Sequence, residues 1–249
     1  MAIDLQKISG LPILFDEKNN DLEFRGDFGE IKKSERSLED LKPYLKNSDI
    51  KKGLDPVYYV WRHVYLKRDS EKIKENNLRY DLTLLPAGTI DSDSEREYVK
   101  TAGHYHERYP EIYEVLLGKA YFLVQSESNV YAAEVSQGEK FLIPPSYGHS
   151  TINVFNEPLI MANWVSEKAV YDYESYKNNS GAMYYFLKNG DFVDIIKNSN
   201  YKSAPEIKKI FPKEYPEFGI LKNKPLYSLV ETLEKLRFLN YPEEFKLEI

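Results

Sequence analysis

Two histidines and a carboxylate lie within eight residues of one another near the middle of the chain. His104 and His106 are two residues apart, and Glu111 follows five residues later. Residues two apart on a β-strand point to the same face, so both imidazoles would face one side. The longer spacing leaves room for a turn and a second strand that returns Glu111 to them. Such a set suits a divalent transition metal with open coordination positions.

Many short strands are expected to position these ligands. Runs rich in β-branched and aromatic residues alternate with Gly, Pro and Asn turns, and no helical period interrupts them. This pattern is typical of a β-barrel or jelly roll, so we predict an all-β fold. The expected strands cover residues 57–65, 81–85, 112–117, 120–125, 130–135, 150–154 and 159–165.

The chain is predicted to form a single domain around this barrel, because it shows neither an internal repeat nor a linker. Residues 1–56 are expected to form an N-terminal arm or cap. Residues 57–175 are expected to form the barrel core. Residues 176–249 are expected to form a C-terminal extension, a hairpin plus a helix, packed on the barrel.

Local signals predict several further elements. Ser37 begins a short helix, with Asp40 at the capping-box position. Asn189-Gly190 between two apolar runs predicts the hairpin. The helix is predicted from one apolar face, formed by Leu226, Leu229, Val230, Leu233 and Leu236. The remaining polar stretches are expected to be a surface loop or short helix (67–79), an exposed loop (91–97) and irregular structure (198–224).

Composition narrows the possible partners and location. The 249 residues carry a net charge of -6, which argues against nucleic acid as the main partner, since phosphate binding needs a basic face. The chain has no cysteine, so any metal must be held by nitrogen and oxygen ligands. The N-terminus lacks a basic stretch followed by an apolar run, and the apolar runs are too short to span a membrane. We therefore expect a cytoplasmic protein that interacts with neither membrane nor nucleic acid.

The histidine stretch and a second segment together resemble the two-part signature of the cupin superfamily. The first part is His104-x-His106, Glu111 and Gly118, and the second part is Gly138, Pro144, His149 and Asn153. The resemblance implies a metal site made by His104, His106, Glu111 and His149. Tyr98 and Ser146 stand where the cupin motifs have glycines, which serve turns and not ligation.

A finer match is similar to the cupin-type glucose-6-phosphate isomerases of archaea and some bacteria. It rests on Thr101 to His106, Glu111-Ile112-Tyr113, Gln125, Pro144 to Asn153, Asp81-Leu82-Thr83 and Pro86 to Thr89, and it covers about residues 30–175. The resemblance implies a homodimer that interconverts glucose 6-phosphate and fructose 6-phosphate. It also implies one divalent metal per subunit, with Fe²⁺ as the first choice and Mn²⁺, Zn²⁺ or Ni²⁺ as alternatives.

The same resemblance implies roles for individual residues. The catalytic residues would be Glu111, Tyr113 and His149, and the sugar phosphate would be bound by Thr83, Thr101, Gly103, Tyr113 and Tyr173. Hydrogen would move between C1 and C2, through a cis-enediol with Glu111 as base or by a hydride shift. A carboxylate bound to a cation is a poor base, so Glu111 cannot easily be both ligand and base.

Two other functions use the same residues. One is a different metal-dependent cupin enzyme, such as a dioxygenase, and the other is a non-catalytic sugar-phosphate-binding cupin. Outside the motif, His63 is expected to be a hydrogen-bonded structural residue. Glu114 is expected to point away from the ligands, and Arg108 to be a solvated loop charge.

Overall fold

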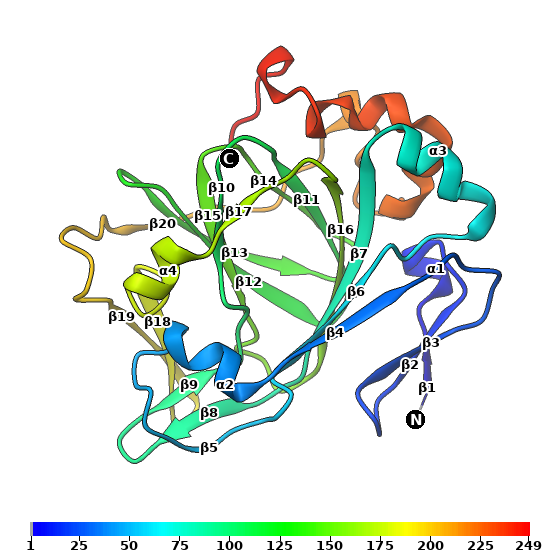
Figure 1. Ribbon diagram of the computed structural model, residues 1–249. Coiled ribbons are helices and arrows are strands. Elements are labelled where there is room, and N and C mark those ends of the chain that lie inside the picture. Colours follow the sequence, from blue (N-terminus) through cyan, green and yellow to red (C-terminus); the bar gives the residue numbers. More distant parts are fainter. Residues whose placement is uncertain (1) are drawn as a thin grey trace.

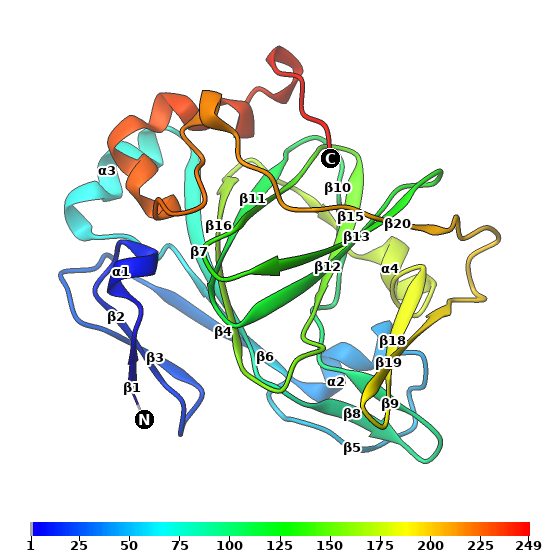
Figure 2. The ribbon, with the colours of Figure 1, turned by 180° about the vertical axis from the view of Figure 1, so that it is seen from behind.

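The computed structural model describes residues 2–249, and two six-stranded sheets form its centre. They face each other as the two halves of a jelly-roll barrel (Figures 1 and 2), which confirms the predicted all-β fold. The first sheet consists, in order, of β17 (Tyr171–Asp172), β10 (His104–His106), β15 (Tyr147–Ile152), β12 (Lys119–Gln125), β13 (Val130–Ser136) and β20 (Ile207–Lys209). The second consists of β14 (Lys140–Ile143), β11 (Glu111–Leu117), β16 (Leu159–Ser166), β7 (Leu78–Leu85), β6 (Tyr58–Arg62) and β4 (Lys32–Arg36).

Strands β7, β11 and β16 of the second sheet are buried on both faces, which explains their nearly continuous apolar sequences. On β11, Tyr113 and Val115 point into the core inside the barrel, whereas Ile112 and Leu116 point into a second core outside it. The outer core lies between this sheet and the C-terminal extension, where Trp164 of β16 donates a hydrogen bond to Leu226 O at 3.0 Å. Strand alternation therefore places a polar residue either in the barrel or under the extension.

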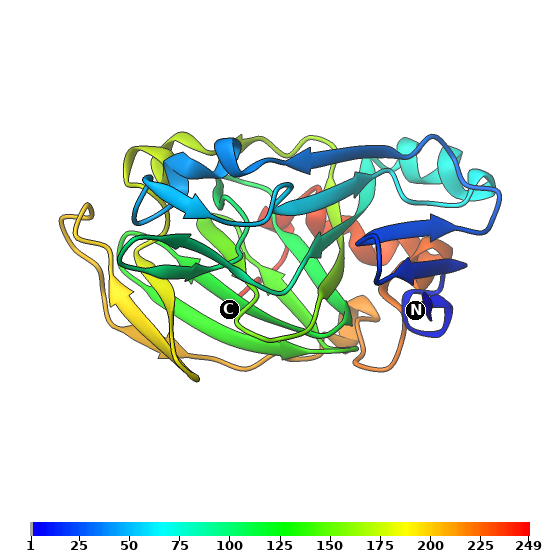
Figure 3. The ribbon, with the colours of Figure 1, turned by 90° about the horizontal axis from the view of Figure 1, so that it is seen from below.

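A second pair of sheets lies at the two ends of the barrel. The N-terminal sheet contains β1 (Ala2–Asp4), β2 (Ile13–Asp16) and β3 (Asp21–Phe24), with α1 (Gln6–Ser9) beside it. A five-stranded sheet contains β19 (Phe192–Lys197), β18 (Tyr184–Asn189), β9 (Arg96–Tyr98), β8 (Thr89–Ser92) and β5 (Ile50–Lys52). Figure 3 shows the N-terminal sheet beside the C-terminal helices at one end and the β18–β19 hairpin at the other.

Several local predictions are confirmed. Ser37 caps α2 (Leu38–Leu41) in a capping box with Asp40, and the chain continues into η1 (Lys42–Tyr44). The β18–β19 hairpin turns at Asn189-Gly190, and β12 pairs with β13 across residues 126–129. Residues 67–79 contain η2 (Lys67–Asp69) and α3 (Ser70–Glu75) before β7 begins.

Other local predictions need correction. Residues 91–97 are not a loop, because β8 and β9 pair there and leave only a short turn. The strand predicted over 57–65 ends at Arg62, because His63 adopts a left-handed backbone with φ of 62°. Within 198–224, β20 pairs in parallel with β13, and η3 (Pro216–Phe218) follows.

The predicted C-terminal helix forms as a kinked 3₁₀ helix. This helix, η4 (Leu226–Leu239), is interrupted at Thr232, whose φ and ψ are −145° and 55°. All five predicted apolar residues are nevertheless buried against the outer core. The described chain is completed by α4 (Glu174–Asn178) and η5 (Pro242–Glu244). None of the helices over residues 2–249 is long and apolar enough to cross a lipid bilayer.

Candidate metal centre and substrate pocket

Three histidines and a glutamate converge inside the barrel, as the motif spacing predicts. His104 and His149 are direct cross-strand partners of β10 and β15, and His106 lies two residues further along the same face. Glu111 reaches the same point from the start of β11 in the opposite sheet. One donor atom from each of these four residues lies within 4.8 Å of the others.

The distances within this cluster are short. The Nε2 atom of His106 lies 3.0 Å from Nε2 of His104 and 3.1 Å from Nε2 of His149. Glu111 Oε2 lies 3.2 Å from His106 Nε2 and 3.6 Å from His149 Nε2. Ring nitrogens and a carboxylate oxygen thus point at one common centre.

The surroundings of the cluster favour neutral His104 and His149 and an ionised Glu111. Burial lowers the pKa of His104 and of His149, and the neighbouring histidines lower both further. Burial alone would raise the pKa of Glu111, but the nearby imidazoles of His106 and His149 outweigh it, so the net shift is downward. Neutral imidazoles beside an ionised carboxylate are a ligand set ready for a divalent metal.

The groups around the cluster orient two of the ligands. His106 Nδ1 donates to the carbonyl of Tyr109 at 2.9 Å, which leaves the Nε2 lone pair directed at the centre. Asn163 of β16 donates to Glu111 Oε1 at 2.5 Å. Glu111 Oε2 has no hydrogen-bond partner among residues 2–249 although it is buried. A buried oxygen without a partner, aimed at three imidazoles, fits a metal ligand.

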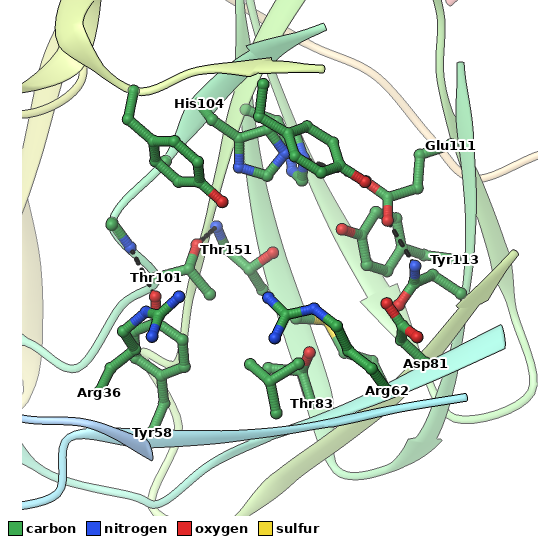
Figure 4. Close-up of a pocket in the computed structure, with 18 of the residues that line it drawn as sticks. Arg36, Tyr58, Arg62, Asp81, Thr83, Thr101, His104, Glu111, Tyr113 and Thr151 are labelled. Atoms are coloured by element: carbon green, nitrogen blue, oxygen red, sulfur yellow. Dashed lines mark hydrogen bonds and ion pairs between the residues drawn. The ribbon is translucent and has the colours of Figure 1, made fainter. Parts of the chain in front are cut away.

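The cluster faces a cavity that contains about 630 Å³ of space not filled by protein, including its open mouth. Figure 4 shows His104 and Glu111 on one side of this cavity and Arg36, Arg62 and Thr83 on the other. The cavity is lined by every residue predicted to contact the sugar phosphate, namely Thr83, Thr101, Gly103, Tyr113 and Tyr173. His106 is buried behind the other ligands and does not line it.

Thr101 and Gly103 are also fixed by the fold itself. The Thr101 hydroxyl accepts a hydrogen bond from the Thr151 backbone N–H at 3.0 Å, which leaves its own proton free to donate. Gly103 has a φ of 82°, and a Cβ there would lie 2.6 Å from the ring of Tyr176. Glycine is therefore required for close packing as well as for backbone access to the cavity.

The tyrosines lie close to the metal ligands. Tyr113 is buried beside Glu111, and burial together with that negative charge raises its pKa well above the ordinary value. The rings of Tyr173 and Tyr171 lie 5.2 Å and 4.4 Å from the His104 ring, measured between centroids. Burial also raises the pKa of Tyr171 and of Tyr173, so all three hydroxyls are protonated near neutral pH and can donate hydrogen bonds.

Sequence reasoning missed a charged part of this pocket. Its lining also includes Arg36, Tyr58, Arg62, Arg79 and Asp81. Tyr58, Val60 and Arg62 alternate along β6, so strand periodicity could have placed them on one face. Burial raises the pKa of Asp81 to about 6, although Arg79, whose Nε lies 2.7 Å from an Asp81 oxygen, opposes the shift.

Residues expected to lie outside the site do so. His63 lies outside the pocket, with Tyr65 Oη and Glu167 each 3.4 Å from its Nδ1. Arg108 pairs with exposed Glu243 at 3.0 Å. Glu114 points away from the ligands and pairs with Lys140 at 2.8 Å.

Comparison with known proteins agrees with the geometry of the site. Residues 35–204 match the family model described as glucose-6-phosphate isomerase (GPI). A glucose-6-phosphate isomerase of Thermococcus onnurineus is 31% identical over 178 residues, which cover 69% of this chain and 89% of that protein. One of Thermococcus litoralis is 31% identical over 169 residues, covering 65% and 84%. A solved structure of oxalate oxidase is 20% identical, with a TM-score of 0.32 over 39% of this chain and 45% of that chain.

Proposed function

The chain belongs to the glucose-6-phosphate isomerase family, and from this premise we propose that it is a metal-dependent enzyme that interconverts glucose 6-phosphate and fructose 6-phosphate. The observation that carries the metal dependence is the cluster of His104, His106, Glu111 and His149 at the wall of the cavity. Three nitrogens and one oxygen suit Fe²⁺, Mn²⁺, Zn²⁺ or Ni²⁺, and the family resemblance favours Fe²⁺ among them. A bound ion would supply a Lewis acid that polarises the sugar carbonyl.

The side chains around the cluster give the C1–C2 end of an open-chain sugar its environment. Glu111 is the carboxylate placed to take a proton from C2 and return it to C1 through a cis-enediol. Asn163 donates a hydrogen bond to Glu111 Oε1 at 2.5 Å, and Glu111 Oε2 lies 3.2 Å from His106 Nε2. A direct hydride shift between C1 and C2 would not need Glu111 as a base. Both routes fit this geometry.

The rest of the pocket would bind the sugar chain and its phosphate. Tyr113 presents a protonated hydroxyl beside Glu111 and would donate to a sugar oxygen. Thr83 and Thr101 supply hydroxyls to the cavity wall, and Gly103 lets the backbone approach the ligand. Tyr173, next to His104, would close the cavity over the sugar.

An isomerase assay before and after metal removal tests this function. Fructose 6-phosphate is measured with a coupled reporter after treatment with a chelator and then after addition of Fe²⁺, Mn²⁺, Zn²⁺ or Ni²⁺. We expect turnover to fall at least about 100-fold on chelation and to return with one of these ions. Full turnover in a sample shown by elemental analysis to be metal-free would contradict the proposal.

Isomerisation in deuterium oxide separates the two hydrogen-transfer routes. Deuterium in the product at C1 or C2 supports proton transfer by Glu111, because an exchangeable carboxyl proton mixes with solvent. Product without deuterium supports a hydride shift or a transferred proton that is shielded from solvent.

The family resemblance also leads us to propose a cytoplasmic homodimer that binds one metal ion in each subunit. Light scattering after size-exclusion chromatography tests the assembly: a dimer of the 29.2 kDa chain is expected, and a monomer at micromolar concentration would contradict it.

A further inference from the structure

The cavity contains two arginines, Arg36 and Arg62, that lie beyond ion-pair distance of every carboxylate of residues 2–249. Arg36 is the last residue of β4, and Arg62 is the last residue of β6. Neither guanidinium forms an ion pair with a carboxylate of residues 2–249. Arg79 in the same cavity differs, because Asp81 and Glu167 lie 2.7 Å and 3.3 Å from its guanidinium. Arg36 and Arg62 are therefore the cations of the pocket that are not held in a close ion pair.

Strand pairing places both arginines on the wall that faces into the cavity. Arg36 is the cross-strand partner of Tyr58, and cross-strand partners share a face. Arg62 lies four residues beyond Tyr58 on β6 and hence on that face too. Both guanidinium groups point into the cavity in Figure 4, on the side away from His104 and Glu111.

Most of the hydrogen-bond donors of these two side chains have no partner among residues 2–249. Arg62 donates one hydrogen bond to Ser34 Oγ at 3.2 Å, and Arg36 contacts the Tyr58 hydroxyl. Both guanidinium groups act on Tyr173: burial raises the pKa of the Tyr173 hydroxyl, and the positive charges of Arg36 and Arg62 oppose this rise. Tyr173 also lies beside His104, so it connects the arginine side of the cavity to the metal side.

We infer that Arg36 and Arg62 bind the phosphate of the substrate and make the site selective for dianionic phosphate esters over free sugars. This inference rests on the proposed isomerase function. An open-chain hexose 6-phosphate carries its carbonyl at one end and its phosphate at the other. The cavity carries the metal ligands at one end and two guanidinium groups at the other. Guanidinium groups match phosphate oxygens in a two-pronged geometry, which hydroxyls alone do not provide.

Calorimetric titrations and kinetics of arginine variants test the inference. The variants are Arg36→Gln, Arg62→Gln and the double variant, with Arg36→Lys and Arg62→Lys as charge-preserving forms. Arg25→Gln is the matched control, because Arg25 is exposed in the N-terminal sheet region. Inorganic phosphate, glucose 6-phosphate and glucose are the three probes.

We expect each Gln variant to weaken binding of inorganic phosphate and of glucose 6-phosphate about 10-fold or more, and the double variant to weaken it about 100-fold. The KM for glucose 6-phosphate should rise accordingly, with kcat changed less than KM. The affinities of the Lys variants for both anions should lie between those of wild type and the Gln variants. Arg25→Gln should bind both anions as wild type does, and no variant should change the binding of glucose.

Some results would overturn the inference. A folded double variant that binds inorganic phosphate and glucose 6-phosphate as wild type does would do so. A wild-type protein without measurable affinity for either anion would also do so. A wild-type protein that binds glucose 6-phosphate through these arginines but does not isomerise it would instead overturn the proposed function and leave this inference standing.

Discussion

Two buried glutamates on β11, three residues apart, lie on opposite faces of the strand and have opposite surroundings. Glu111 faces the barrel, where three imidazoles surround it. Glu114 faces the outer core, where Lys140 Nζ lies 2.8 Å away and the backbone N–H of Leu226 donates at 2.7 Å. The Glu111 carboxylate is surrounded by imidazoles, whereas the Glu114 carboxylate is paired with the ammonium group of Lys140.

The difference teaches how to distinguish a binding site from a structural ion pair. Burial raises the pKa of Glu114 to about 7 and lowers the pKa of Lys140, although each partner's charge opposes the shift. Lys140 also donates to the carbonyls of Gly138 and Lys222, at 2.8 Å and 2.6 Å. This group is complete without a ligand, and it attaches the C-terminal extension to the barrel.

The largest expected effect is the loss of catalysis when Glu111 becomes an amide. Glu111→Gln removes the only charged ligand of the cluster, so we expect kcat/KM for glucose 6-phosphate to fall about 1,000-fold or more. Glu114→Gln should change kcat by no more than a few fold in the folded fraction. Similar kinetic losses in the two variants would contradict the distinction between the two faces.

The second effect is on stability and comes from the other face. Lys140→Met leaves the Glu114 carboxylate buried without its cation, which should lower the free energy of unfolding by about 3–5 kcal/mol. The double variant Glu114→Leu/Lys140→Met should recover most of this loss, because apolar residues of similar size need no charge partner. Urea denaturation measures both. A single variant as stable as wild type would show that the pair does not hold the extension.

A smaller effect is expected when the support of Glu111 is removed. Asn163→Ala frees Glu111 Oε1, so the carboxylate is less well oriented, and we expect metal affinity to fall about 10–100-fold. Excess metal should restore most of the turnover in this variant but not in Glu111→Gln. Metal titration of the activity measures the shift. An unchanged midpoint would mean that Asn163 does not position the ligand.

The smallest effect concerns the fourth histidine. His63 lies outside the cavity and has a left-handed backbone that asparagine also tolerates. His63→Asn should therefore leave kcat/KM within about two-fold and the free energy of unfolding within about 0.5 kcal/mol. A loss of activity as large as that of Asn163→Ala would place His63 in the chemistry after all.

Three of the four metal ligands could be grouped from sequence because their geometry is local, whereas His149 joins them only through the resemblance to the cupin signature. His104 and His106 share a face through strand periodicity, and one turn returns Glu111 to them. Arg36 could not be placed, because its position depends on the pairing of β4 with β6 across 21 intervening residues that carry no register signal. The apolar period that predicts the η4 helix likewise gives no sign of its interruption at Thr232.

The central claim is that the cluster around Glu111, and not any other group, binds the catalytic metal. Its most direct test is a calorimetric titration of chelator-treated protein with Mn²⁺, combined with the glucose 6-phosphate isomerase assay on the same samples. Wild type and Glu114→Gln are predicted to bind one ion per chain and to regain turnover in proportion to occupancy, whereas Glu111→Gln should regain none. Equal ion binding and equal turnover in Glu111→Gln and wild type would contradict the account.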